Sequence, residues 1–243
     1  DPFFWGAYVM APWCNHARPG ATDVAGRTID LAPNFPDGTA IHGQVYARPW
    51  HGGSDRRLHV PHHEQGWPWP YEVRLRPDLD GTTLGLTLQL TNRSDRPMPA
   101  GIGLHPWFVR PLEIRVPATA VYRSNPDSPP RPEPVDGTPL DLRSITEPPT
   151  DLDATWTTLH ERSVELRWPA LRLAAELVTR TDAPACVGIA TPRDPDATAV
   201  EVQTHGPDGF RRLVSGEPDA LALLEPDVSM ELRVELRVRR THD

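Results

Sequence analysis

Apolar and polar residues alternate with a period of two along much of the chain. Two such runs, Tyr71–Arg76 and Leu84–Asn92, flank the pair Asp80-Gly81, and Asp-Gly between alternating runs is a strong signal for a β-hairpin. Further strands are predicted over Val164–Trp168, Leu171–Val178, Ala185–Ala190, Ala199–Gln203, Ala220–Leu224 and Met230–Val238. Because no stretch repeats apolar residues every 3.6 positions over three turns, the pattern predicts an all-β protein of mostly antiparallel strands, arranged as a sandwich.

Proline is unusually common, with 30 of 243 residues or about 12%, against about 5% in an average protein. Proline is excluded from helix interiors and from central strand positions, which argues against a mostly helical fold. The richest stretch, residues 125–149, could be a linker between two domains. However, Leu140, Leu142 and Ile145 within it could pack, so we expect an ordered loop inside one domain spanning residues 1–243.

The net charge of −8 argues against nucleic acid or an anionic membrane surface as the main partner. No apolar run approaches the length of a membrane span. Two cysteines, Cys14 and Cys186, are too few for a disulfide framework, and reduced thiols indicate an intracellular protein. We therefore expect a cytoplasmic protein.

Histidine is the natural place to look for chemistry near neutral pH. The ten histidines include four in notable settings: His42 before a glycine, the His59-x-x-His62-His63 cluster, His105 before Pro-Trp-Phe, and His205 before Gly-Pro-Asp. The His59 cluster lacks cysteine or carboxylate partners at useful spacing, so no metal site is predicted.

Two of the polar residues could act together. His105 is held by the following proline beside Trp107, and aromatic faces of this kind stack on the apolar faces of sugar rings. Glu201 stands between Val200 and Val202, so its pKa would be raised if its side chain faced a cleft. The alternative is that Glu201 is an ordinary outward residue of an alternating strand.

Seven segments, in order along the chain, are similar to motifs of the aldose 1-epimerases, or galactose mutarotases. They are Gly6–Asn15 (the Gly-rich strand before an Asn-Arg pair), Ile41–Gly43 with Trp50 (L-H-G…W), Asn92–Phe108 (a strand ending H-P-Y-F), Val135–Arg143 (G-T-x-F-D-F-R), Leu152–Trp156 (D-x-x-F), Val200–Gln203 with Gly206–Asp208 (E-T-Q…P-D-A) and Leu224–Asp227 (L-x-P-G-E). Each motif is weak alone, but seven in the correct order identify the chain as a member of this family.

The resemblance implies a single-domain β-supersandwich and the interconversion of the α and β anomers of a free aldose. Glu201 would be the general base that takes the proton from the C1 hydroxyl, and His105 the general acid that protonates the ring oxygen. We expect both side chains in one cleft with a pyranose between them. The resemblance further assigns substrate binding to His42, Asp153, Asn15, His16, Trp50 and Trp107.

This chemistry requires no metal and no organic cofactor. The expected partner is a small-molecule sugar, with no nucleic acid and no membrane, and the expected state is a monomer or weak dimer.

Three departures from the family pattern stand out. Asn15-His16 replaces the Asn-Arg pair, with Arg18 near but out of register, which predicts weak binding of simple hexoses. The glutamine expected on the strand before the catalytic glutamate has no clear counterpart around Val187-Gly188. The family's opening strands have no counterpart before Gly6, so we expect either a truncated sequence or an incomplete first sheet.

Two other functions stay open. A hexose 6-phosphate epimerase would need a basic cluster beside the pocket to meet the phosphate dianion, and Arg56-Arg57 or Arg211-Arg212 could supply it. A sugar-binding module without catalysis is favoured by His16 but opposed by the retention of both Glu201 and His105.

Overall fold

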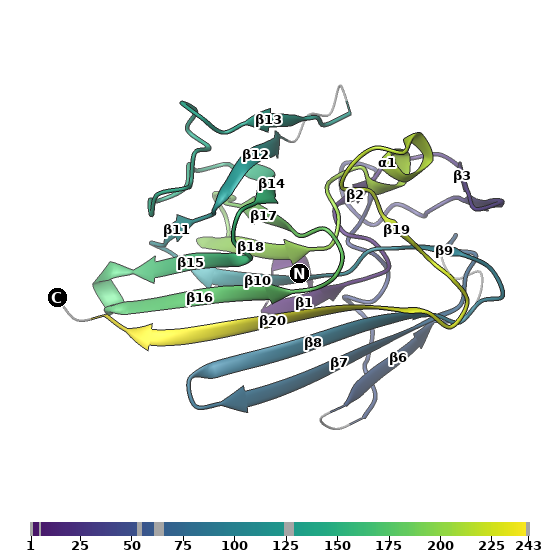
Figure 1. Ribbon diagram of the computed structural model, residues 1–243, viewed down its shortest axis with the longest axis horizontal. Coiled ribbons are helices and arrows are strands. Elements are labelled where there is room, and N and C mark those ends of the chain that lie inside the picture. Colours follow the sequence, from purple (N-terminus) through teal and green to yellow (C-terminus); the bar gives the residue numbers. More distant parts are fainter. Residues whose placement is uncertain (1, 5, 53–54, 61–65, 124–128, 242–243) are drawn as a thin grey trace.

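The computed structural model describes residues 2–4, 6–52, 55–60, 66–123 and 129–241 (Figure 1). Two large sheets of antiparallel strands lie one above the other, and short paired strands and one helix lie beside one end (Figure 1). The predicted all-β sandwich is therefore confirmed.

The elements are η1 (Pro2–Phe4), β1 (Ala7–Met10), β2 (His16–Ala17), β3 (Thr22–Val24), β4 (Arg27–Ile29), β5 (Ala40–Ile41), β6 (Arg56–Val60), β7 (Tyr71–Asp80), β8 (Thr83–Asn92), β9 (Met98–Ala100), β10 (Gly103–Val109), β11 (Glu113–Arg115), β12 (Ala118–Arg123), β13 (Pro132–Pro134), β14 (Asp153–Leu159), β15 (Ser163–Trp168), η2 (Pro169–Leu171), β16 (Leu173–Arg180), β17 (Cys186–Ala190), β18 (Ala197–Gln203), α1 (Gly209–Ser215), β19 (Ala222–Leu224) and β20 (Ser229–Arg240).

The first sheet has the strand order β1-β10-β18-β17-β14-β12-β13, and the second has the order β11-β15-β16-β20-β8-β7-β6. The hairpin predicted around Asp80-Gly81 is present, with Asp80 paired to Thr83 and Gly81 at a φ of 56°. The positive φ explains why glycine stands in this turn. All the other predicted strands are also present, with ends displaced by a few residues.

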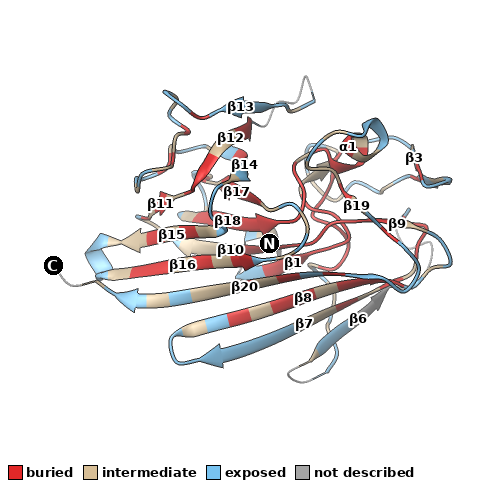
Figure 2. Ribbon diagram, in the orientation of Figure 1, coloured by how far each residue is buried: buried red, intermediate tan, exposed pale blue. Residues whose placement is uncertain are grey.

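Strand β18 runs through the middle of the first sheet and is buried along almost its whole length (Figure 2). Val200 and Val202 belong to the main hydrophobic core. Because successive side chains of a strand point to opposite faces, Glu201 and Gln203 project from the other face of the sheet. They are buried there as well. Glu201 therefore does point away from the core, as the alternative expected, but its side chain is covered by other parts of the protein.

The described part of the proline-rich stretch is an ordered loop, as predicted. Leu140 and Leu142 are buried, and the indole N–H of Trp156 donates to the Leu140 carbonyl at 3.0 Å. One feature was not predicted: residues Pro132–Pro134 form strand β13 at the edge of the first sheet. An edge position suits prolines, which cannot donate to a strand on their N–H side.

Helix α1 was also not predicted, because its seven residues are too few to display a helical period. It ends at Gly216, which has a φ of 66° and donates its N–H to the carbonyls of Arg212 and Leu213, a common helix stop. Among the described residues, no helix has both the length and the apolar character to cross a membrane.

Candidate active site

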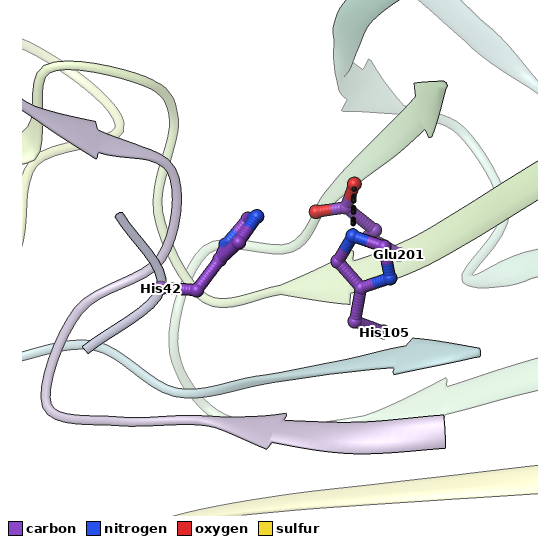
Figure 3. A group of neighbouring side chains, drawn as sticks. All are labelled: His42, His105 and Glu201. Carbon is purple, nitrogen blue, oxygen red and sulfur yellow. Dashed lines mark ion pairs between the residues drawn. The ribbon is translucent and has the colours of Figure 1, made fainter. Parts of the chain in front are cut away.

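The predicted acid and base lie in direct contact at the centre of the first sheet. His105 on β10 and Glu201 on β18 occupy neighbouring strands, and the His105 Nε2 atom lies 3.1 Å from Glu201 Oε1 (Figure 3). Both side chains are buried, with exposed fractions of 4% and 8%. A buried carboxylate is costly unless it is paired and hydrogen-bonded, and the imidazole supplies such a partner.

The second carboxylate oxygen of Glu201 is also occupied, because Gln203 Nε2 donates to Oε2 at 2.6 Å. Burial alone would raise the pKa of Glu201, but the neighbouring imidazoles of His105 and His42 and the hydrogen bonds of His105 and Gln203 together lower it to about 2. We expected a raised pKa from the apolar neighbours along the strand. In the structure the pKa of Glu201 is lowered instead, because the groups that face the carboxylate stabilise its charged form more than burial destabilises it.

The third member of this group is His42, which follows β5 and faces the pair from another part of the chain (Figure 3). The backbone N–H of Asn15 points at His42 Nδ1 at 3.2 Å. Because a backbone N–H can only donate, Nδ1 must accept, and the proton of the neutral ring lies on Nε2. Burial lowers the pKa of His42 to about 3. His42 is therefore a neutral hydrogen-bond donor in the site.

His42, His105 and Glu201 could in principle hold a metal, since one ligand atom of each lies within 4.8 Å of the others. The hydrogen bond from Asn15 argues against it: Nδ1 is already an acceptor and Nε2 carries the proton, so a metal could bind His42 only if that bond broke. The set therefore fits proton transfer better than metal binding. The cluster considered at His59, His62 and His63 lies outside the residues whose side chains the structure describes.

Aromatic rings hold His105 in place. Tyr8 on β1 is paired across the sheet with His105, and the two rings stack with centroids 4.3 Å apart and planes 21° from parallel. The Trp107 ring lies 5.2 Å from His105 and donates its indole N–H to the Phe3 carbonyl at 2.8 Å. Tyr8 was not identified from the sequence, because only the strand pairing brings it opposite His105.

A cavity of about 340 Å³, a size suited to a small molecule, is lined by residues other than His42, His105 and Glu201. Three of the predicted sugar-binding residues, Asn15, His16 and Asp153, line it together with Arg18 and Asp208. Asn15 also reaches back to the acid–base pair, because its Nδ2 donates to Gln203 Oε1 at 2.7 Å. The cavity and the pair are thus joined through two side chains, Asn15 and Gln203.

His16 occupies the position of the family's arginine. Its Nδ1 lies 2.7 Å from Thr39 Oγ1 and 3.2 Å from Asp37 Oδ2, so the ring is tied to the wall of the cavity. Trp50 is not brought to this group: it packs against the main hydrophobic core and does not line the cavity.

Three of the four arginines in the two predicted basic clusters are paired or buried, and the exposed Arg56 does not line the cavity. Arg57 pairs with Asp55 at 2.7 Å, and Arg211 pairs with Asp208 at 2.7 Å. Arg212 is buried, with its guanidinium carbon 4.4 Å from the centre of the Tyr122 ring. These arginines are neutralised or enclosed, so none of them forms a phosphate site at the cavity.

The family model for aldose 1-epimerase matches residues 2–209. The chain belongs to the aldose 1-epimerase family. Since the match extends over most of the chain, it covers every residue of the candidate site.

Solved structures with the same fold include members of this family. An Escherichia coli K12 protein provisionally named an aldose 1-epimerase is 23% identical, with a TM-score of 0.83 over 97% of this chain and 84% of that one. The GalM/aldose epimerase homologue of C. elegans is 13% identical, with a TM-score of 0.78 over 96% and 82%. Galactose 1-epimerase from Lactobacillus acidophilus NCFM is 16% identical, with a TM-score of 0.74 over 96% and 80%.

Among curated proteins, the uncharacterized protein YphB of Escherichia coli (strain K12) is 28% identical over 116 residues. That match spans 46% of this chain and 40% of YphB, so it reaches less than half of either protein.

Proposed function

We propose that this member of the family is an aldose 1-epimerase that interconverts the α and β anomers of a free aldose. The contact between His105 and Glu201 carries the proposal, since it joins an imidazole and a carboxylate that can act as acid and base. Gln203 and Asn15 connect this pair to the cavity. The reaction requires these two groups, one to remove a proton and one to supply it.

In the proposed reaction, Glu201 takes the proton from the C1 hydroxyl, the electron pair of that O–H bond forms the C1 carbonyl, and the C1–O5 bond breaks. The imidazolium of His105 gives its proton to O5. Rotation about C1–C2 then turns the other carbonyl face to O5, and the reverse proton transfers close the ring. Atoms and charges balance, and both groups return to their starting state.

The 3.1 Å contact leaves no room for a pyranose between the two side chains, which differs from the expected arrangement. We propose that the C1–O5 edge of the sugar replaces this contact. Removing the imidazole from the carboxylate would raise the pKa of Glu201 toward the working pH, where a base is most effective.

His42 has a separate part in this proposal. Its neutral ring offers Nε2–H as a donor, and a donor aimed at an oxygen that gains negative charge lowers the barrier. We expect His42 to donate to the sugar oxygen that gains charge as the ring opens, rather than to exchange a proton.

The lining of the cavity favours an uncharged sugar over a sugar phosphate. Asp37, Asp153 and Asp208 oppose Arg18 and Arg123 there, so carboxylates outnumber guanidinium groups. A phosphate dianion would meet net negative charge in such a cavity.

Polarimetry on freshly dissolved α-D-glucose and α-D-galactose tests the proposal, because mutarotation without an enzyme is slow. The protein should accelerate it, whereas Glu201→Gln should not, and the exposed Glu231→Gln should behave like the unaltered protein. Glucose 6-phosphate should be a poorer substrate than glucose. If sugars bind but their rate of mutarotation stays unchanged, the non-catalytic binding module is the correct function.

A further inference from the structure

A continuous chain of side-chain hydrogen bonds joins the cavity wall to the acid–base pair. Asn15 Nδ2 donates to Gln203 Oε1 at 2.7 Å, and Gln203 Nε2 donates to Glu201 Oε2 at 2.6 Å. Glu201 Oε1 then meets His105 Nε2 at 3.1 Å. The proposed acid–base mechanism does not use either amide, so this arrangement needs its own explanation.

The charge of Glu201 sets the direction of this chain. An ionised carboxylate can only accept, so Gln203 must turn its NH₂ group toward Glu201 and its oxygen toward Asn15. Asn15 must in turn present its NH₂ group. Each amide therefore has one favourable orientation, and reversing either would place oxygen against oxygen.

The neighbouring strand is shaped to leave room for these amides. Gly188 on β17 is paired with Glu201, and a Cβ atom on Gly188 would lie 2.8 Å from Gln203 Nε2 and 3.2 Å from Glu201 Cδ. Any side chain at position 188 would displace the Gln203 amide. The family pattern places a glutamine on this strand, around Val187-Gly188. Here the amide of Gln203, from the neighbouring strand β18, lies beside Gly188 instead.

The backbone of Asn15 is fixed independently of its side chain. Asn15 and His42 both have left-handed backbones, with φ values of 59° and 58°, and each donates its backbone N–H to the other residue at 3.2 Å. One position earlier, Cys14 donates its N–H to the Nε2 atom of the buried His205 at 2.9 Å. Two consecutive backbone N–H groups thus donate to two buried imidazoles. Non-glycine residues hold such a strained backbone only where their surroundings impose it.

We propose that Asn15 is a positioning residue: acting through Gln203, it fixes the Oε2 side of Glu201 so that Oε1 stays turned toward His105 and the sugar. The kinetic consequences rest on the proposed function, but the hydrogen-bond chain itself does not. A role for Asn15 in sugar binding, which the family resemblance implies, is the alternative.

Asn15→Gly is the informative variant, because glycine keeps the left-handed backbone and its N–H bond to His42 while the amide is lost. We expect kcat to fall by about tenfold or more, as for other residues that orient a reacting group, with little change in KM. Since Glu201 loses support for its ionised form, the acidic limb of kcat/KM should move about one unit to higher pH. Ala25→Gly, an exposed left-handed position in the β3–β4 turn, is the matched control and should change neither.

Gln203→Met provides the second variant if Asn15→Gly fails to fold, because it removes the same link at its other end. Both variants should act through one path, so the double variant should be no slower than Gln203→Met alone. If the losses of rate in the two single variants instead multiplied in the double variant, the proposal would be overturned. So would an Asn15→Gly enzyme with a raised KM and an unchanged kcat and pH profile, which would assign Asn15 to sugar binding.

A readout without catalysis separates this proposal from the proposed function. The carboxyl carbon of Glu201, identified by its loss in Glu201→Gln, can be titrated by ¹³C NMR. The other titratable groups near this carboxylate are His105, His42, Tyr8 and Cys14, all of which Asn15→Gly retains. If the protein fails to act on any aldose but Asn15→Gly still raises the pKa of Glu201, the function is wrong and the positioning role stands. An unchanged titration overturns the positioning role whatever the activity.

Discussion

Tyr8 lies flat against His105, with the ring centroids 4.3 Å apart, from the directly paired position on the edge strand β1. The Tyr8 ring covers one face of the imidazole, and the Nε2 atom of His105 points to Glu201. The orientation of the acid is thus set by a ring from a different strand.

We predict that Tyr8→Phe retains nearly full activity, since the aromatic face remains. Tyr8→Leu should lower kcat by about two- to tenfold, the equivalent of the ~0.5–1.5 kcal/mol that an aromatic pair contributes. Steady-state mutarotation rates of the two variants check this. Equal losses in both would instead assign importance to the phenol group.

Removing the acid or the base should have a much larger effect. We predict that Glu201→Gln and His105→Asn each lower kcat by about 10²–10⁴, the range for loss of one general acid or base. Thermal unfolding should be recorded in parallel, because each variant leaves its former partner buried and unpaired. Folded variants with undiminished rates would contradict the assignment of both residues.

The replacement of the family's arginine by His16 predicts a particular kinetic pattern. An arginine at this position could keep the contact with Asp37 and would add donors for sugar hydroxyls. We predict that His16→Arg lowers KM for galactose or glucose more than it changes kcat, since the gained contact binds ground and transition states alike. If Arg18 has taken over this task, Arg18→Ala will instead raise KM and His16→Arg will not help.

Stability should depend on pH through His205. Its Nε2 accepts from Cys14, so the ring proton lies on Nδ1, which donates to the Gly206 carbonyl at 2.6 Å. Burial lowers the pKa of His205 to about 4. As the pH falls from about 6.5 to 4, the unfolded chain binds a proton that the folded chain does not. Stability is therefore full above this range and is lost on acidification.

We predict that the free energy of unfolding of His205→Gln falls less steeply than that of the unaltered protein between pH 6.5 and pH 4. Urea titrations at several pH values measure this difference, and the contributions of the carboxyl groups common to both proteins cancel in it. Parallel pH curves would show that His205 is protonated in the folded state.

Treatment with a metal chelator should leave both the fold and the mutarotation rate unchanged, because the Asn15 bond occupies the Nδ1 atom of His42. Activity that is lost to the chelator and restored by zinc would contradict this tautomer. It would also reopen the metal site considered at His59, His62 and His63.

The strands were predictable because local patterns specify them: the Tyr71–Asn92 hairpin follows from its alternation and its Asp-Gly turn. The positions of Glu201 and His105 followed from their motifs. The link from Asn15 to Gln203 could not be predicted, since 188 positions separate the two residues along the chain. The same holds for the pKa of Glu201, which depends on groups from other strands. The sequence shows which side chains are available, whereas the strand pairing decides which of them meet.

The alternation along β18 limits how this protein can change in length. Glu201 and Gln203 share the face of the site, and Val200 and Val202 share the face of the core. Deleting one residue between Ala197 and Val200 would exchange the two faces, placing valines in the site and a carboxylate in the core. A deletion in the preceding loop at 191–196 leaves the alternation intact. Single substitutions in β18 can therefore have graded effects. Inserting or deleting one residue of this strand ahead of Glu201 would instead disrupt the site and the core together.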